Sequence, residues 1–352
     1  MRPPEAFVAG LHLRWDGVWQ RPHHLLTRLA GRVPVIVIEE PHGAHEDRDE
    51  IRRFGDLTVI RPLRRRGWGE PLVDEQALAT ARDLAAGRRC GAWLYTPMMS
   101  DIVAAFAAAP VIYDAMDDLA NFDFAPRGMR EREAALLDRA DIVFAGGRTL
   151  YENRRARGAK VHCHPSGVEF ERFAADTGPH PLAAMLAAPV FAYVGVIDER
   201  LDYDIVAALA DAFPHGHVLL AGPVVKVDPA RLPQRPNVHF TGRLPYDSLP
   251  SLLAGVDVAL MPFAINRATA SISPTKTLEY FAARKPVVST PVADVVAAYG
   301  EIAYIAAGAD AFVAAVREAL HAPADRIARG VAAAAHETWD AIFARMWDEA
   351  FA

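Results

Sequence analysis

Cysteine is almost absent from this sequence of 352 residues. The two cysteines, Cys90 and Cys163, give neither a disulfide framework nor a C-x-x-C metal pair, so a reducing compartment is the simplest location. Residues 1–8 lack the apolar core of a signal peptide, and the longest apolar runs are too short to span a bilayer. We therefore expect a soluble, cytoplasmic protein.

Several common catalytic motifs are also missing. The sequence contains no G-x-G-x-x-G, G-x-x-x-x-G-K-[ST], H-E-x-x-H or G-x-S-x-G, which disfavours nicotinamide dehydrogenases, P-loop enzymes, zinc proteases and α/β-hydrolases. The formal net charge of −6 gives no reason to expect a nucleic-acid partner. Lysine occurs at only four positions, which makes each lysine informative.

Short apolar runs rich in β-branched residues alternate with helical stretches along the chain, and a turn-rich lapse around residues 173–188 divides the pattern in two. This alternation predicts parallel sheets covered by helices on both faces. Because 352 residues exceed one ordinary core, we expect an α/β protein with two doubly wound, Rossmann-like domains facing across a cleft. Strands are expected at 7–10, 33–38, 57–60, 93–96, 111–114, 142–145, 161–164, 190–194, 218–221, 238–241, 258–261, 287–289 and 303–305. Helices are expected at 22–30, 74–86, 131–139, 204–213, 246–254, 274–283, 309–320 and 324–349.

The segment 271–290 carries the most specific signal. Ser273 suits a helix N-cap and Pro274 the first helical position, so a helix is expected to begin there and end before Pro286. Its unpaired N–H groups, with Lys276 one turn in, would suit a diphosphate, and Glu279 would suit sugar hydroxyls. The alternative is a surface helix with an ordinary Lys276–Glu279 pair.

Two groups follow the expected strand 190–194. Gly195 would let the backbone approach a phosphate closely, and Arg200 could contact the same anion; a plain turn with a solvated arginine is equally compatible. Asp202 and Asp204 form a D-x-D pair, for which capping of the next helix is favoured over metal binding.

The expected first domain contains residues that could bind a second substrate, an acceptor that carries a hydroxyl group. Asp117, with Asp118, follows the strand 111–114 and could orient an acceptor hydroxyl, act as a base or cap a helix. The loop 10–24 is rich in side chains that suit sugar stacking and hydrogen bonding, although its tryptophans could equally be core residues and its arginine a surface charge. The candidates in this loop are His12, Trp15, Trp19, Gln20, Arg21, His23 and His24.

Other charged clusters receive less specific interpretations. The histidines lack carboxylate or cysteine partners at ligand spacing, so we expect no metal. The arginine-rich run 61–68, with Arg52 and Arg53 before it, is either a solvated loop or a contact for anionic lipid headgroups. If the run contacts lipid headgroups, we expect a cytoplasmic protein that binds peripherally at the inner face of the membrane.

In their order along the chain, these segments resemble the GT-B glycosyltransferases, most closely family 4 (glycosyl transferases group 1) and its branch of teichuronic-acid and exopolysaccharide transferases. The resemblance extends over nearly the whole chain. It rests on residues 15–30, 113–118, 164–169, 237–246, 257–263 and 274–289.

The resemblance assigns roles to individual positions. It implies that Glu279 bonds the donor ribose, that the loop 271–276 lies along the diphosphate, and that Gly195 and Arg200 belong to a second phosphate-contacting loop. Ser271 stands where the family has the first of two glutamates, and Ser166 stands where the family has an asparagine. The catalytic histidine of the family has no clear counterpart, which leaves Asp117 and the His23/His24 pair as candidates.

The implied activity is transfer of a sugar from a nucleotide-diphosphate donor, UDP-linked by expectation, to an acceptor hydroxyl of a sugar or a lipid-linked sugar in cell-surface polysaccharide synthesis. The resemblance favours retention of configuration, and we expect no metal and no cofactor. Two alternatives are a GT-B nucleotide-sugar epimerase and a non-catalytic partner protein. The expected domains are 1–175 for the acceptor and 189–323 for the donor, with a helix at 324–352 that returns to the first. The expected catalytic residues are Asp117, Arg200 and Lys276, and the donor-binding residues are Gly195, Arg200, Ser271, Ser273, Pro274, Thr275, Lys276 and Glu279.

Overall fold

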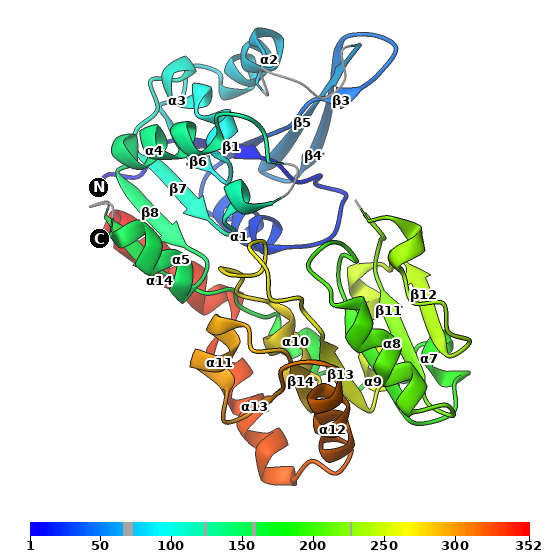
Figure 1. The fold of residues 1–352 in the computed structure, drawn as a ribbon. Coiled ribbons are helices and arrows are strands. Elements are labelled where there is room, and N and C mark those ends of the chain that lie inside the picture. Colours follow the sequence, from blue (N-terminus) through cyan, green and yellow to red (C-terminus); the bar gives the residue numbers. More distant parts are fainter. Residues whose placement is uncertain (66–72, 123–124, 157–159, 226) are drawn as a thin grey trace. The chain divides into compact units, whose positions relative to one another are not determined.

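The computed structural model describes residues 1–65, 73–122, 125–156, 160–225 and 227–352. The chain divides into two compact units (Figure 1). The first unit contains Met1–Pro165 together with Ile342–Ala352, and the second contains Ser166–Ala341.

The described part of the first unit is built on a sheet with the strand order β3-β5-β2-β1-β6-β7-β8-β9, to which β4 adds by pairing with β5. Only the β4–β5 pairing is antiparallel among the described strands. Along the parallel strands β1, β2, β5 and β6 the sheet order is 3-2-1-4, so it reverses between β1 and β6. The strands are β1 (Ala6–Leu11), β2 (Val35–Glu39), β3 (His42–Gly43), β4 (Arg48–Phe54), β5 (Leu57–Arg64), β6 (Cys90–Leu94), β7 (Val111–Ala115), β8 (Ile142–Ala145) and β9 (Val161–Cys163).

Central strands of this sheet are buried along their whole length. All residues of β1, β2, β6, β7 and β8 are buried, as expected for parallel strands with both faces covered. The α-helices of the unit are α1 (Arg21–Ala30), α2 (Glu75–Ala85), α3 (Asp101–Ala105), α4 (Met129–Arg139) and α5 (Arg148–Arg155).

The second unit has a parallel sheet with the strand order β12-β11-β10-β13-β14-β15. Counted along the chain, this order is 3-2-1-4-5-6, the doubly wound arrangement that reverses between β10 and β13. The strands are β10 (Val190–Val194), β11 (His217–Ala221), β12 (Val238–Gly242), β13 (Val258–Met261), β14 (Val287–Ser289) and β15 (Tyr304–Ile305).

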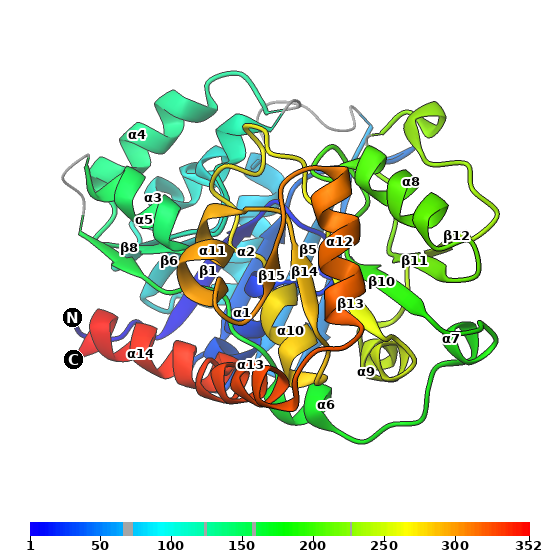
Figure 2. The ribbon, with the colours of Figure 1, turned by 60° about the horizontal axis from the view of Figure 1, so that its bottom comes forward.

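Helices surround this second sheet, with α12 packed on α8 and α10 packed on α13 (Figure 2). They are α6 (Phe170–Ala174), α7 (Pro181–Ala184), α8 (Tyr203–Ala212), α9 (Leu249–Ala254), α10 (Lys276–Ala282), α11 (Ala293–Tyr299), α12 (Ala309–Ala319) and α13 (Ala324–His336). Within the described residues, no helix has both the length and the apolar character needed to cross a membrane.

The expected helix over 324–349 is wrong, because the structure has two helices there. After α13 the chain leaves helical geometry at Glu337, and α14 (Trp339–Phe351) follows. Val168 pairs with the chain at this break: its N–H donates to the Glu337 carbonyl (2.9 Å), and its carbonyl accepts the Trp339 N–H (3.2 Å). These backbone bonds replace those that a continuous helix would have made.

The structure also divides the chain earlier than the lapse at 173–188 suggested. Helix α6 packs on α9 and α10, and Phe173 is 2% exposed within the core of the second unit. A buried aromatic side chain anchors this stretch, so the turn-rich residues that follow it are part of the second unit.

Candidate functional site

The loops that leave β10 and β13 are hydrogen-bonded to each other where the strand order of the second unit reverses. The Asp202 N–H donates to the Pro262 carbonyl (2.8 Å), and the Ala264 N–H donates to the Arg200 carbonyl (2.8 Å). Doubly wound sheets bind ligands beyond the carboxyl ends of their strands at such a reversal. The two loops therefore border a candidate site within the second unit.

Gly195, directly after β10, leaves the space that Lys276 occupies. Its φ of +149° lies in a region that other residues rarely adopt. A Cβ there would overlap Cε of Lys276 and lie 2.8 Å from its Nζ. The Lys276 Nζ also lies 6.0 Å from the centroid of the Tyr193 ring. The structure thus brings together two of the residues that the sequence associated with phosphate.

Glu279 lies on the same helix as Lys276 and is 8% exposed. Burial raises the pKa of its carboxyl to about 7; the Lys276 ammonium opposes this shift and the Glu169 carboxylate adds to it. Within the part of the chain that the structure describes, no hydrogen bond or ion pair holds the Glu279 carboxylate. Lys276 therefore acts on Glu279 electrostatically, without a hydrogen bond or close ion pair between the two side chains. A buried carboxyl with a raised pKa is a common feature of binding and catalytic sites.

The start of α10 differs from the prediction. The helix begins at Lys276, with Thr275 as N-cap and no side-chain cap, whereas Ser273 and Pro274 were expected to open it. The Thr277 N–H donates to the Pro274 carbonyl (3.3 Å), and the Glu279 N–H donates to the Thr275 carbonyl (3.3 Å). Because a tight i→i+3 turn precedes the regular helix, Ser273 and Pro274 lie in the loop, as does Ser271, which is buried.

Arg200 lies in the loop after β10 and forms a fork with Asp198. Its Nε is 2.9 Å from Oδ1 and its Nη2 is 2.7 Å from Oδ2 of that carboxylate. The sequence did not identify Asp198, although its position two residues before Arg200 was a usable signal. An anion bound by Arg200 would have to compete with this carboxylate.

Asp202 caps α8, as the sequence favoured. Its carboxylate accepts the N–H groups of Asp204 (3.1 Å) and Ile205 (3.2 Å). Among the described residues, no three His, Cys, Asp or Glu side chains gather in a way that could hold a metal ion.

In the first unit, His23 is held inside the loop that precedes α1. Its Nδ1 accepts the Gln20 N–H (3.1 Å), and its Nε2 lies 3.3 Å from the Arg14 carbonyl. The rings of Trp15 and Trp19 lie 4.9 and 4.8 Å from the imidazole. Burial lowers the pKa of His23, so both nitrogens of a neutral ring serve the fold. His23, one of the candidates that the sequence left open, is therefore poorly suited to act as a catalytic base.

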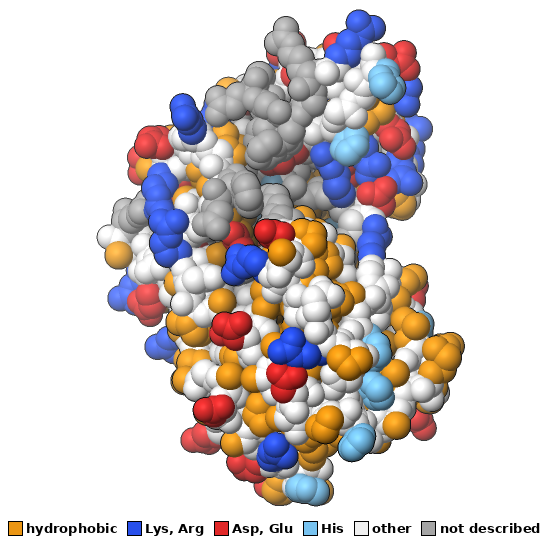
Figure 3. All heavy atoms as spheres, turned by 45° about the vertical axis from the view of Figure 1, so that its right-hand side comes forward, with side chains coloured by type: hydrophobic (Ala, Val, Ile, Leu, Met, Phe, Trp, Pro, Cys, Tyr) orange, Lys and Arg blue, Asp and Glu red, His pale blue; other side chains and the backbone are white. Residues whose placement is uncertain are grey.

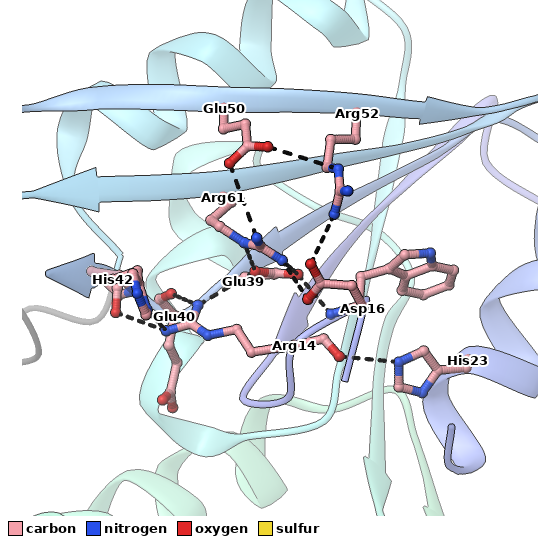
Figure 4. A network of polar contacts seen from close by, with 11 residues as sticks. Arg14, Asp16, His23, Glu39, Glu40, His42, Glu50, Arg52 and Arg61 are labelled. Carbon is pink, nitrogen blue, oxygen red and sulfur yellow. Dashed lines mark hydrogen bonds and ion pairs between the residues drawn. The ribbon is translucent and has the colours of Figure 1, made fainter. Parts of the chain in front are cut away.

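A buried carboxylate organises the polar side of the same loop (Figure 4). Glu39, the last residue of β2, accepts the Trp15 N–H (2.7 Å) and the Arg61 Nε (2.8 Å). Arg61 also contacts Asp16 through Nη2 (2.7 Å), and Arg52 contacts Asp16 through Nη1 (3.0 Å). The sequence did not single out Glu39, whose partners are 24 and 22 residues away.

Arg21 was expected to contact an acceptor or lie at the surface, and it is instead 2% exposed. Its Nε donates to Asp114 (2.9 Å), which is fully buried at the centre of the sheet, and its Nη1 donates to the His164 carbonyl (2.7 Å). Arg21 thus links α1 with β7 and the chain after β9. This network leaves the guanidinium unsuited to an acceptor contact.

The remaining acceptor candidates divide by exposure. Trp15 and His24 are buried, and the Trp19 Nε1 donates to His24 Nδ1 (3.3 Å). His12 follows β1 and is half-buried, as are Trp19 and Gln20. Among the expected acceptor-binding residues of this loop, His12, Trp19 and Gln20 are therefore more accessible to a ligand than Trp15.

Asp117 lies two residues beyond β7 and is half-buried. Its neighbour Asp118 is held by the fold, because it accepts from Asn121 Nδ2 (2.9 Å) and lies 3.5 Å from Arg154 Nη2. Arg154 is 2.6 Å from Glu133 in turn. These contacts fix the segment that presents Asp117 at the carboxyl end of the sheet.

Two arginines of the run 61–68 lie on a strand and not in the solvated loop that was one expectation. Arg61 and Arg64 lie on β5, where Arg64 pairs with Asp49 and Asp74. Residues 66–68 lie outside the described residues. Basic and acidic side chains are interspersed over this part of the unit (Figure 3), and their ion pairs reduce the positive charge available to a lipid surface.

Comparisons with known proteins agree with this arrangement. The chain has the fold of sucrose-phosphate synthase from Thermosynechococcus elongatus, with a TM-score of 0.74, 15% identity and 98% of each chain covered. It also has the fold of Anabaena HepE, solved in complex with UDP, with a TM-score of 0.69, 13% identity, and 98% of this chain and 99% of that chain covered. Two doubly wound units with these neighbours define a GT-B glycosyltransferase fold.

The sequence matches are more specific. Residues 188–322 match the family described as glycosyl transferases group 1. The chain is 27% identical over 238 residues to TuaH of Bacillus subtilis (strain 168), a protein named as a glycosyltransferase of teichuronic acid biosynthesis. That alignment spans 62% of this chain and 59% of the relative. Residues 188–322 are thus similar to the group 1 glycosyltransferases, and the chain has the fold of its structural neighbours.

Proposed function

We propose that this protein transfers a sugar from a UDP-linked donor to an acceptor hydroxyl in the synthesis of a cell-surface polysaccharide, with retention of configuration and without a metal. One observation carries the proposal: Lys276 and Glu279 lie on one helix at the strand reversal, with Lys276 against Gly195. This places a cation and a buried carboxylate beside the end of β10.

The charges match the parts of a nucleotide diphosphate. The Lys276 ammonium would neutralise the diphosphate, which gains charge as the sugar departs, and a preorganised cation is effective for that purpose. The Glu279 carboxylate has no bonded partner among the described residues, so it is available to accept hydrogen bonds from the two ribose hydroxyls. UDP is also the nucleotide bound to HepE.

The acceptor would be held by the first unit, and Asp117 is the residue proposed to orient its hydroxyl. It follows a central parallel strand and its segment is fixed by Asp118 and Arg154. In a retaining transfer the departing phosphate oxygen can take the acceptor proton. The acceptor is proposed to be a sugar or a lipid-linked sugar by analogy with the polysaccharide pathway for which TuaH is named.

Titration calorimetry with UDP tests the donor site directly. We expect the natural protein to bind UDP, and Lys276→Met to lower turnover by about 10²–10³, as is typical of lost charge stabilisation. Lys160→Met, which removes an exposed lysine of the first unit, is the matched control. It should leave both UDP affinity and turnover unchanged. Undiminished turnover in Lys276→Met would contradict the assignment.

A second set of measurements separates the alternatives. An epimerase would convert a UDP-sugar without an acceptor, and a non-catalytic partner would bind no donor. We expect UDP release to require an acceptor and to persist in EDTA. Conversion of the donor alone, or loss of activity with the chelator, would overturn the corresponding part of the proposal.

A further inference from the structure

Three tyrosine hydroxyls bond the backbone of the loop that leaves β10. The Tyr280 hydroxyl accepts the Val194 N–H (2.8 Å), and the Tyr193 hydroxyl donates to the Val196 carbonyl (3.0 Å). The Tyr203 hydroxyl donates to the carbonyl of residue 198 (2.9 Å). We call Tyr193, Tyr203 and Tyr280 the tyrosine clamp.

The Tyr280 hydroxyl takes the place of a missing strand partner. The pairing of β10 with β13 extends only through Phe191–Val258 and Ala192–Ala259, so the two strands separate before β10 ends. The Val194 N–H is buried there and needs an acceptor, which the hydroxyl provides. Tyr280 therefore completes the hydrogen bonding of β10 where the strand order reverses between β10 and β13, the place where such sheets bind ligands.

The clamp encloses the glycine that faces Lys276. Val194 and Val196 flank Gly195, and the hydroxyls hold one backbone group on each side of it. Tyr280 is also one helical turn beyond Lys276 on α10, and the Tyr193 ring lies near the Lys276 ammonium. The clamp thus fixes the loop relative to the helix that carries Lys276 and Glu279.

All three tyrosines are buried, so the presence of a polar hydroxyl on each ring requires an explanation. Tyr193, Tyr203 and Tyr280 are 1%, 7% and 0% exposed. A phenylalanine would fill nearly the same space and bring no hydroxyl to desolvate. What the hydroxyls add is directional bonding to the loop backbone.

We propose that the tyrosine clamp positions the backbone of residues 194–198 to receive the donor diphosphate, with Tyr280 as its central member. The inference rests on the proposed donor site. The three tyrosines are positioning residues, since they act through the loop and Lys276. A loop released from the clamp would populate its binding-competent conformation less, and the apparent affinity falls in proportion to that population.

The test compares Tyr280→Phe with the natural protein in binding UDP and uridine, by calorimetry and by NMR titration. We expect UDP to bind about tenfold more weakly, the equivalent of one net hydrogen bond, while uridine affinity stays the same because the clamp serves the diphosphate. Tyr299→Phe is the control: its ring packs on Phe281, and its hydroxyl makes no hydrogen bond with the described residues.

Hydrogen exchange gives a readout that needs no ligand. The amides of residues 194–198 should exchange faster in Tyr280→Phe than in the control, with other strands unchanged. Unaltered UDP affinity or unaltered exchange in Tyr280→Phe would overturn the clamp while leaving the donor site in place. Equal weakening of UDP and uridine would also overturn it. Failure of the natural protein to bind UDP would overturn both proposals.

Discussion

Replacing Glu279 with glutamine should stabilise the protein at neutral and alkaline pH. The same change removes the negative charge that the Glu279 carboxylate would offer to the donor. The reason for the stabilisation is the pKa of Glu279, which burial raises from 4.5 to about 7. The folded state therefore retains a proton between these two values that the unfolded state has lost. Since stability falls with pH wherever the folded state binds more protons, the natural protein should lose stability as the pH rises from 4.5 through 7.

The magnitude follows from the size of the shift. Each pKa unit corresponds to about 1.4 kcal/mol, so the full shift amounts to about 3 kcal/mol, reached once the pH exceeds the folded-state value. Glutamine is neutral at every pH and avoids this cost. The free energy of unfolding of Glu279→Gln should match that of the natural protein near the unfolded-state pKa and exceed it by about 3 kcal/mol above the folded-state pKa.

Thermal unfolding over a pH series measures this difference. For a unit of this size, 1 kcal/mol corresponds to roughly 2–4 °C in Tm, so the two transitions should separate progressively with rising pH. Glu301→Gln, which neutralises an exposed glutamate of the second unit, is the matched control and should show no such divergence. A constant difference between Glu279→Gln and the natural protein across the series would refute the reasoning, as would greater stability of the natural protein at alkaline pH.

Further predictions concern the same site and the core of the first unit. UDP affinity of the natural protein should decline as the pH is lowered through about 7, because the ionised Glu279 is the better acceptor for ribose hydroxyls; Glu279→Gln should lack this component in calorimetry. Gly195→Ala should weaken UDP binding by displacing Lys276, whose Cε occupies the space of the new Cβ, and a crystal structure would show the shift. Arg21→Met should destabilise the first unit by about 3–5 kcal/mol, because it leaves Asp114 buried without its cation; denaturant unfolding measures this, and Arg21→Met with Asp114→Asn should recover part of the loss.

The sequence predicted the sheets well because their strands are buried apolar runs separated by turns. The expected ranges 142–145, 190–194, 258–261 and 287–289 match β8, β10, β13 and β14 residue for residue. Strand β4 was missed because its burial pattern is mostly exposed or half-buried, and its sequence RDEIRRF carries charges in place of an apolar run. Its partner β5 supplies the hydrogen bonds that its composition does not suggest.

Donor-side residues could be found from sequence because they lie within one local segment. Lys276 and Glu279 are three residues apart, and helical geometry alone puts them on neighbouring positions. Asp198 and Tyr280 were not recognised, since their importance depends on what the loop after β10 does in three dimensions. A tyrosine in a helix gives no sign that its hydroxyl will complete a strand 86 residues away.

On the acceptor side, by contrast, several residues of suitable type have a structural role instead. Trp, His and Arg side chains near a strand end suit a sugar, but they can also contact other protein groups. The indoles of Trp15 and Trp19 pack against His23 in tilted geometry, and Arg21 Nε donates to Asp114. Whether Arg21 binds a ligand or a protein group depends on Asp114, which lies 93 residues away in the sequence and cannot be recognised from local spacing. A polar aromatic loop therefore identifies a ligand site only once its own hydrogen bonds have been assigned. By that criterion Glu279, buried and without a bonded partner among the described residues, is the stronger candidate.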